Sequence, residues 1–356
     1  MRKARIILSL PIMAGLLLTI GATHAQAQDW KQLLDLRGQW KFEIGDDVRR
    51  ADSAFNDAKW EQVFVPANWE DEGFPGYDGY AWYRKRFRAP GEWKGKSLYL
   101  HLGHIDDVDE VYLNGHLIGF SGGFPPKYFT AYDANREYPL MGAYLKYAGD
   151  NVIAVRVFDE KLGGGINYGK IGIFEDATAF RTDFQLPAMW KFTTGDNMEW
   201  KETGFDDSRW KDVIVPALWE TQGFRDYDGF GWYRVKFRLP QQLTEKRLIA
   251  MVGRIDDLDE VYINGERIGR TGYISSNRDR LSISDEYLEV RAYTIPSDLL
   301  RTDRENVMAV RVYDGFQHGG IYNGPIGIVT RDRYRKWEES QKEQMKEWNV
   351  FDFLLK

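Results

Sequence analysis

The sequence predicts an all-β protein with two tandem antiparallel β-sandwich domains and a short C-terminal helix. The first observation is a duplication, because 34 of 65 ungapped residue pairs are identical between 55–119 and 205–269. Unrelated sequences match at only a few positions, so each copy is a repeat of domain size. The second observation is that short alternating segments with Gly, Pro and Asn-Gly turns dominate both copies, with little helical pattern. We expect repeat 1 at 28–180 and repeat 2 at 181–332.

The N-terminal segment 1–27 has the pattern of a secretory signal peptide. Three basic residues precede an apolar run at 6–20, and Ala25-Gln26-Ala27 fits an A-x-A cleavage site. The run is short for a membrane span, so we expect cleavage after Ala27 and an exported protein, periplasmic or extracellular. The chain contains no Cys, so each domain must build its core without disulfides.

The charge balance argues against two classes of partner. Lys and Arg number 48 against 54 Asp and Glu, which gives a net charge of −6. Removing 1–27 takes away three basic residues and no acidic ones, which leaves −9. Nucleic acid and anionic membrane surfaces both require a basic patch, so neither is expected as a partner. No other apolar run is long enough to cross a bilayer, so we expect no membrane insertion.

The elements of repeat 1 are short strands. Alternating patterns lie at 40–44, 83–87, 98–102 and 152–158. Asn114-Gly115 between apolar pairs is the strongest hairpin signal in the chain, since both residues tolerate a positive φ.

Repeat 2 keeps the same order of motifs at an offset of 150 residues, which becomes 155 near its end. The extra residues lie in 271–303, where a loop tolerates insertion. The connection at 177–185 is short, so we expect the two domains to touch. Segment 333–356 is charged and contains spaced aromatic residues, which predicts an amphipathic helix docked on repeat 2. A helix that binds a partner is the alternative.

Several motifs together resemble a known family. They are Phe205-Asp206-Asp207-Ser208-Arg209-Trp210, Val215-Pro216-Ala217-Leu218-Trp219, Trp232-Tyr233-Arg234, Gly253-Arg254-Ile255-Asp256-Asp257 and Asn264-Gly265. They resemble the galactose-binding-like jelly roll at the amino-terminal side of family 2 glycoside hydrolases such as β-galactosidases. The jelly roll of bacterial sialate O-acetylesterases looks closer still. The resemblance covers nearly all of both repeats and implies a jelly-roll fold with a sugar-binding role.

The resemblance does not extend to a catalytic domain. The family's glycosidases carry their catalytic glutamates on a separate TIM barrel, and the esterases carry a nucleophilic Ser in a G-D-S motif. Neither domain fits into this chain, so we expect no catalytic residues. The G-x-S-x-G match at 119–123 precedes Phe124-Pro125-Pro126, which opposes the helix that a nucleophilic Ser needs. We interpret it as a glycine-rich loop.

An acidic motif recurs in both repeats, at 106–110 and 256–260. Four interpretations stay open: a catalytic carboxylate pair, a Ca²⁺ site, acceptors for sugar hydroxyls, or a turn held by Asp side chains. In the β-galactosidases that this chain resembles, the residue eight positions before the Asn of the Asn-Gly turn reaches toward bound galactose. The resemblance therefore implies that role for Asp106 and Asp256.

Further candidates share an ability to stack on a sugar or to bind its hydroxyl groups. The candidate carbohydrate-binding residues are Asp106, Asp107, Trp82, Arg84, Asp159 and Tyr168 in repeat 1, and Asp256, Asp257, Trp232, Arg234, Asp314 and Tyr322 in repeat 2. Aromatic faces pack on the C–H face of a pyranose, although a sandwich core also needs large inward residues. The two Arg could instead form structural pairs with aspartates. His101, His104 and His116 have no counterparts in repeat 2, which favours surface histidines over a metal site.

The sequence thus predicts an exported carbohydrate-binding accessory protein of glycan breakdown. Its expected partner is a glycan, and it needs no cofactor, with structural calcium left open. The alternative is a hydrolase, either a β-galactosidase-like glycosidase or a sialate O-acetylesterase, acting alone or as a subunit. A third interpretation is a structural module that docks on a separate hydrolase chain.

Overall fold

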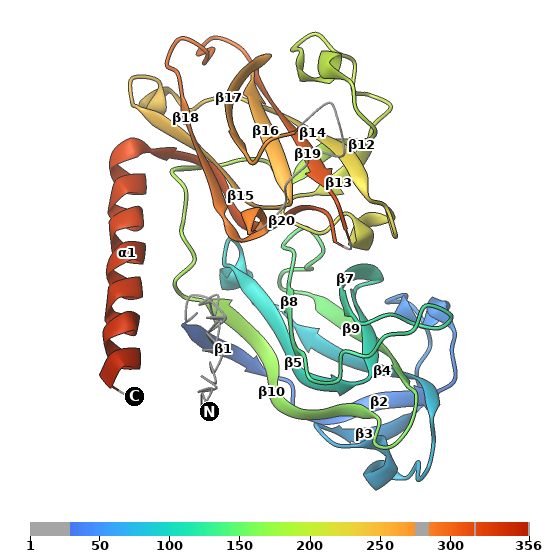
Figure 1. Ribbon diagram of the computed structural model, residues 1–356. Helices are drawn as coiled ribbons and strands as arrows, with labels where there is room; N and C mark the ends of the chain where they lie inside the picture. Colours follow the sequence, from blue (N-terminus) through green and yellow to red (C-terminus); the bar gives the residue numbers. More distant parts are fainter. Residues whose placement is uncertain (1–28, 275–284, 317, 355–356) are drawn as a thin grey trace, which may run out of the picture.

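The computed structural model describes residues 29–274, 285–316 and 318–354, which form two β-sandwiches and one long helix (Figure 1). Each repeat contains two antiparallel sheets, one of four strands and one of six. The all-β fold with a C-terminal helix is therefore confirmed. The predicted signal peptide at 1–27 lies outside the described residues.

In repeat 1, the four-stranded sheet has the order β1-β10-β5-β8 and the six-stranded sheet β3-β2-β4-β9-β6-β7. The strands are β1 (Trp30–Asp35), β2 (Gly38–Ile44), β3 (Glu61–Val65), β4 (Gly79–Arg88), β5 (Leu98–Asp106), β6 (Val108–Leu113), β7 (His116–Ser121), β8 (Asn135–Pro139), β9 (Asp150–Asp159) and β10 (Gly165–Asp176).

Repeat 2 has the same two sheets strand for strand, in the orders β11-β20-β15-β18 and β13-β12-β14-β19-β16-β17. The strands are β11 (Phe184–Gln185), β12 (Met189–Thr194), β13 (Lys211–Ile214), β14 (Gly229–Phe237), β15 (Leu248–Asp256), β16 (Leu258–Ile263), β17 (Glu266–Thr271), β18 (Val290–Ile295), β19 (Asn306–Asp314) and β20 (Gly320–Thr330). The duplication read from the sequence is thus a duplication of the whole sandwich.

The core of each sandwich lies between its two sheets, because alternate side chains on each strand point to the same face. On β9, Ile153, Val155 and Val157 are buried in this core. Arg156, between two of them, points to the other face and pairs with Glu110. The same alternation on every strand leaves the ends of the strands and their loops as the places where polar groups gather.

The predicted hairpin at Asn114-Gly115 is confirmed. Leu113 on β6 pairs with His116 on β7, so the turn contains only these two residues. Both have positive φ, 53° for Asn114 and 90° for Gly115, as a tight two-residue turn requires.

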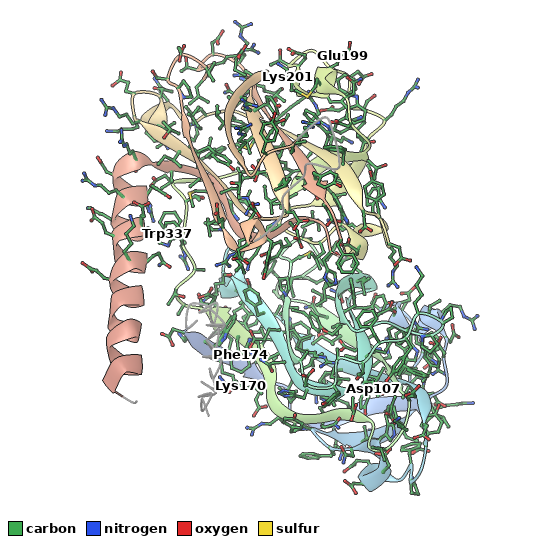
Figure 2. All side chains as sticks on the ribbon, in the orientation of Figure 1. Asp107, Lys170, Phe174, Glu199, Lys201 and Trp337 are labelled. Carbon is green, nitrogen blue, oxygen red and sulfur yellow. The ribbon has the colours of Figure 1, made fainter. Side chains whose placement is uncertain are left out.

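Helix α1 (Arg331–Leu354) follows β20 directly and begins two residues before the predicted start at 333. Tyr334 and Trp337 pack against an apolar cluster of repeat 2, and Figure 2 shows Trp337 on the side of α1 that faces that repeat. Docking of the later aromatic residues stays a prediction, because side chains beyond Glu343 lie outside the description. None of the described helices is long and apolar enough to cross a membrane.

The two repeats touch, as the short connection predicts. Met141, which follows β8 of repeat 1, is buried in one cluster with Ile214 and Ala217 of repeat 2, and Tyr144 packs against it. The sandwiches therefore share an apolar contact as well as a covalent link.

Candidate functional site

The predicted aspartates lie at the corner where the chain crosses from one sheet to the other. Asp106 ends β5 of the four-stranded sheet, and β6 of the six-stranded sheet begins at Val108. Asp159 ends β9, whose Phe158 pairs with Val108. The fold thus brings Asp159 beside Asp106 and Asp107 although 52 residues separate the two segments in the numbering.

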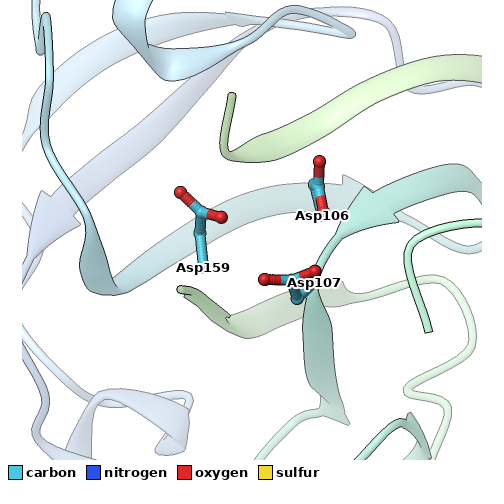
Figure 3. A group of neighbouring side chains, drawn as sticks. All are labelled: Asp106, Asp107 and Asp159. Atoms are coloured by element: carbon cyan, nitrogen blue, oxygen red, sulfur yellow. The ribbon is translucent and has the colours of Figure 1, made fainter. Parts of the chain in front are cut away.

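The three carboxylates of this corner form one group, which we call site 1 (Asp106, Asp107 and Asp159). Each offers an oxygen, and these oxygens all lie within 4.8 Å of one another (Figure 3). An oxygen cluster of this kind suits sugar hydroxyl groups or a hard cation such as Ca²⁺.

The three carboxylates differ in how far the protein satisfies them. Asp107 accepts hydrogen bonds from the Thr130 hydroxyl at 2.5 Å and from the Glu160 backbone N–H at 2.9 Å. Asp159 accepts one from the Lys161 N–H through Oδ1 at 3.2 Å, whereas its buried Oδ2 has no partner among the described residues. Asp107 is therefore held by the protein, and Asp159 retains an unused acceptor.

The electrostatics separate these groups further. Burial, a hydrogen bond with Asp107 and that residue's charge raise the pKa of Asp106 to about 7. Burial opposes ionisation of Asp107, but hydrogen bonds from Thr130 and the Glu160 N–H lower its pKa below the usual value. Burial and the charges of Asp107, Asp78 and Glu70 raise the pKa of Asp159 to about 7. Near neutral pH, site 1 is thus a mixture of charged acceptors and neutral carboxyl groups that can donate.

Large apolar side chains stand exposed around site 1. Phe129 and Tyr132 flank Thr130, and they are 59% and 57% exposed. Leu162, in the loop after Asp159, is 82% exposed. Tyr168 is 57% exposed and stacks on His104, with ring centroids 4.3 Å apart. His104 lies two residues before Asp106 on β5. The sequence analysis named Tyr168 but missed Phe129, Tyr132 and Leu162. The signal for Phe129 and Tyr132 was the presence of aromatic residues in the long Gly- and Pro-containing loop at 122–134.

The equivalent group of repeat 2, which we call site 2, contains Asp256, Asp257 and Asp314. Asp257 accepts a hydrogen bond from the Gly315 N–H at 2.9 Å, and Asp314 Oδ2 lacks a partner among the described residues. Burial, together with Asp257, raises the pKa of Asp256 to about 8. The counterpart of Thr130 falls in 275–284, outside the described residues.

The structure buries four of the predicted sugar contacts among protein groups. Trp82 and Trp232 are fully buried, and their indole N–H groups donate to Asp46 and Asp196. Arg84 is 1% exposed and pairs with Asp57 at 2.8 Å. Arg234 pairs with Asp207 at the same distance. These Arg residues are structural partners of aspartates, which was the alternative interpretation.

Three further residues that the sequence analysis singled out, Tyr322, His101 and Ser121, contact other protein groups. The Tyr322 hydroxyl donates to the Tyr287 backbone oxygen at 2.7 Å, so it ties β20 to the short helix η8 (Glu286–Leu288). His101 is 1% exposed between the rings of Trp30 and Phe174, which corrects its assignment as a surface residue. The Ser121 hydroxyl lies 2.7 Å from that of Tyr138, at the end of β7, and no helix follows it in the described loop.

The acidic motif itself divides among three environments. Asp106 and Asp107 belong to site 1, whereas Asp109 is fully buried and pairs with Arg136 at 2.7 Å. Glu110 points to the other face of the sheet and pairs with Arg156. The pairing of Asp109 with Arg136 has no local signal in the sequence, since 27 residues separate them.

Comparison with known proteins relates part of the chain to glycosidases, although no protein-family model matches it. A stretch of 136 residues, 34% of this chain, is 29% identical to a β-glucuronidase of Formosa agariphila and covers 13% of that relative. A stretch of 163 residues, 42% of this chain, is 28% identical to a β-galactosidase of Bacteroides ovatus and covers 18% of it. The matches thus span less than a fifth of either relative.

Among solved structures, a glycosyl hydrolase family 2 member from Bacteroides cellulosilyticus matches 79% of this chain and 31% of its own, with 16% identity and a TM-score of 0.33. The resemblance to sialate O-acetylesterases stays a prediction. Part of the chain is homologous to family 2 glycoside hydrolases, among them a β-glucuronidase and a β-galactosidase.

Proposed function

We propose that this chain is an exported carbohydrate-binding protein, an accessory of glycan breakdown that binds glycan at site 1. The observation that carries the proposal is the combination at that corner of unsatisfied carboxylate acceptors with exposed aromatic side chains. A pyranose has a polar edge of hydroxyl groups and an apolar C–H face, so it needs both kinds of contact at once. The homology to glycosidases supports the same assignment.

In the proposed complex, Asp106 and Asp159 bind sugar hydroxyl groups while Tyr168 and Phe129 supply apolar contact. The Asp106 side chain hydrogen-bonds to Asp107, and Asp159 Oδ2 has no hydrogen-bond partner among the described residues. Asp107 acts as a positioning residue, since Thr130 and Glu160 already occupy its carboxylate. A carboxylate cluster repels the carboxylate of a uronic acid, so the expected ligands are neutral or amino sugars.

A glycosidase activity of site 1 is the alternative, and one observation favours it. The pKa of Asp106 is raised and that of Asp107 lowered, which is the pattern of an acid paired with a base. However, these two side chains hydrogen-bond to each other, whereas glycosidase carboxylates flank the scissile bond from about 5 Å or more apart. A substrate bond does not fit between them, so we favour binding without hydrolysis.

A glycan array with the purified chain from Gln28 onward tests the proposal. We expect binding to neutral glycans, a loss of about tenfold or more for Asp106→Asn, and unchanged binding for the control Asp35→Asn, which removes only an exposed pair with Arg37. Binding that survives EDTA would leave the carboxylates as direct sugar ligands. Binding that EDTA removes would instead assign them to a bridging calcium ion. No binding to any glycan would overturn the proposal.

Export rests on the signal pattern at 1–27 and is tested separately. Expression of the full gene product in a bacterium should yield a protein that begins at Gln28 in the periplasm or the medium. A cytoplasmic protein that retains Met1 would contradict export without affecting the glycan site.

A further inference from the structure

The contact between the repeats is asymmetric. Repeat 2 contributes the end that carries its aspartates, whereas repeat 1 contributes one of its sides. Arg225 of repeat 2 forms an ion pair with Glu110 of repeat 1. Asp226, next to it, accepts from Lys127 at 3.2 Å. The rings of Phe120 and His318 lie 5.3 Å apart. Together with the apolar cluster around Met141, these contacts cover one end of repeat 2 with the side of repeat 1.

The segments of repeat 2 that carry these contact residues also border site 2. Glu220, in the short helix η5 (Glu220–Gln222), accepts a hydrogen bond from the Gly319 N–H at 3.0 Å, which joins this helix to the loop containing His318. The charge of Glu220 also raises the pKa of Asp256, so Glu220 lies near both Gly319 and Asp256. The loops that would surround a ligand at site 2 are therefore the loops that hold repeat 1.

The matching edge of repeat 1 is covered less among the described contacts, since the loop 122–134 beside site 1 reaches repeat 2 through the exposed pair of Lys127 with Asp226. Glu70, the counterpart of Glu220, is half-buried, whereas Glu220 is only 4% exposed. Residues 168–170 beside site 1 are exposed, whereas their counterparts 323–325 are half-buried, and Asn323 lies 3.5 Å from the Tyr99 hydroxyl of repeat 1. Figure 2 shows Asp107 of site 1 within repeat 1, apart from the boundary between the repeats.

The contact residues are also those in which the two copies differ. Most positions of the contact hold a different residue in the other repeat, although the surrounding motifs are shared. The alignment pairs five contact residues of repeat 2 with different residues of repeat 1: Arg225 with Pro75, Asp226 with Gly76, His318 with Gly163, Asn323 with Tyr168, and Ile214 with Phe64. It pairs three contact residues of repeat 1 with different residues of repeat 2: Phe120 with Arg270, Tyr99 with Ile249, and Met141 with Pro296. A specific contact between two duplicated domains requires their contacting surfaces to differ, because each surface must fit the other rather than a copy of itself.

We propose that the two repeats have divided their roles: repeat 1 carries the working glycan site, and the corresponding edge of repeat 2 serves as the docking surface for repeat 1. This inference rests on the proposed function. It predicts one glycan per chain rather than two linked sites, so the chain gains no avidity from its duplication. It also predicts that the two sandwiches move as one body, because ionic, aromatic and apolar contacts all cross the boundary.

Hydrogen exchange of the whole chain tests the docking surface without any glycan. The variant Arg225→Glu places two like charges together at Glu110, so it should open the boundary. We expect faster exchange in both 220–226 and 120–127. We expect no change there for the matched control Arg209→Glu, an exposed residue of repeat 2 whose charge acts on the neighbouring Asp206. Unchanged exchange in Arg225→Glu would overturn the docking surface.

Parallel glycan arrays of two single variants test the division of roles. Asp106→Asn should lose binding by about tenfold or more, whereas Asp256→Asn should stay within about twofold of the unmodified chain. Equal losses in the two variants would overturn this inference and leave the proposed function standing. An unmodified chain that binds no glycan would overturn both.

Discussion

The two repeats share one internal frame but differ at the surface around their aspartates. Each buries an Arg–Asp pair between its strands, Arg136 with Asp109 in repeat 1 and Arg291 with Asp259 in repeat 2, both at 2.7 Å and fully buried. In contrast, residues 168–170 beside site 1 are exposed, while their counterparts 323–325 beside site 2 are half-buried and contact repeat 1 through Asn323. Both sites have an exposed aromatic residue nearby, since Phe316 next to site 2 is 73% exposed. The duplication thus retained the groups that hold the corner together and changed those that face outward.

The physical reason lies in what a buried charge costs. Each buried Arg is bound by backbone oxygens and one carboxylate, so a change at either partner would leave a charge unpaired in the core. An exposed Tyr or Pro has no such dependence and can change without loss of the fold. A comparison of the two repeats therefore separates structural from functional residues within one chain.

The largest expected effect would break the shared frame. Arg136→Ala leaves Asp109 buried without its partner and should destabilise the protein by about 3–5 kcal/mol. Arg291→Ala should cost a similar amount, because the pair in repeat 2 has the same geometry. Urea unfolding followed by circular dichroism measures both. A loss below about 1 kcal/mol in either variant would show that the pair is not needed there.

A smaller effect concerns two glycines that the corner requires. A Cβ at Gly164 would lie 2.2 Å from the Trp69 ring, and one at Gly319 would lie 2.0 Å from the Trp219 ring. Gly164→Ala and Gly319→Ala should therefore each destabilise by about 1–3 kcal/mol through overpacking. Thermal unfolding compares them with Gly204→Ala, where a Cβ meets nothing within 4 Å. Equal melting temperatures for all three variants would contradict the close packing.

Glycan affinity sharpens the comparison at matched surface positions. Tyr168→Ala removes an exposed ring beside site 1 and should weaken binding by roughly fivefold, about 1 kcal/mol. Asn323, its counterpart in repeat 2, faces repeat 1 instead, so Asn323→Ala should leave the affinity unchanged. Calorimetric titration with an array glycan measures both. A stronger effect from Asn323→Ala would reverse the assignment of the sites.

The pH dependence of stability should differ between the sites. Folding raises the pKa of Asp106 to about 7 and that of Asp256 to about 8. Each neutral carboxyl group contributes fully to the stability of the fold below about pH 4, and this contribution is lost as the pH rises through the folded pKa. Asp106→Asn and Asp256→Asn should therefore match the unmodified chain near pH 4 and exceed its stability above pH 8. For Asp256→Asn, the gain should still grow between pH 7 and 8. Urea midpoints across this range check both, and pH-independent differences would contradict the shifts.

The smallest effect belongs to the exposed part of the boundary. Lys127 and Asp226 are 79% and 78% exposed, so solvent screens their attraction. Lys127→Ala should change the free energy of unfolding by at most about 0.5 kcal/mol. A larger change in urea unfolding would mean that this pair, and not the buried contacts, holds the repeats together.

Local patterns made part of this structure predictable. The duplication, the strand alternation and the Asn114-Gly115 turn depend on neighbouring residues, and the fold confirms them. The sequence left the burial of Trp82 and Arg84 as one of two interpretations, because the outcome depends on which face of β4 the rest of the sheet covers. The approach of Asp159 and Thr130 to Asp107 depends on the crossing between two sheets, which no sequence spacing records.

A crystal structure of the complex with the tightest array glycan tests the central claim most directly. The proposal predicts one glycan per chain at site 1, with sugar hydroxyl groups on Asp106 and Asp159 and a ring face against Tyr168 or Phe129. A glycan at site 2, or on a sheet face away from both groups of aspartates, would contradict it.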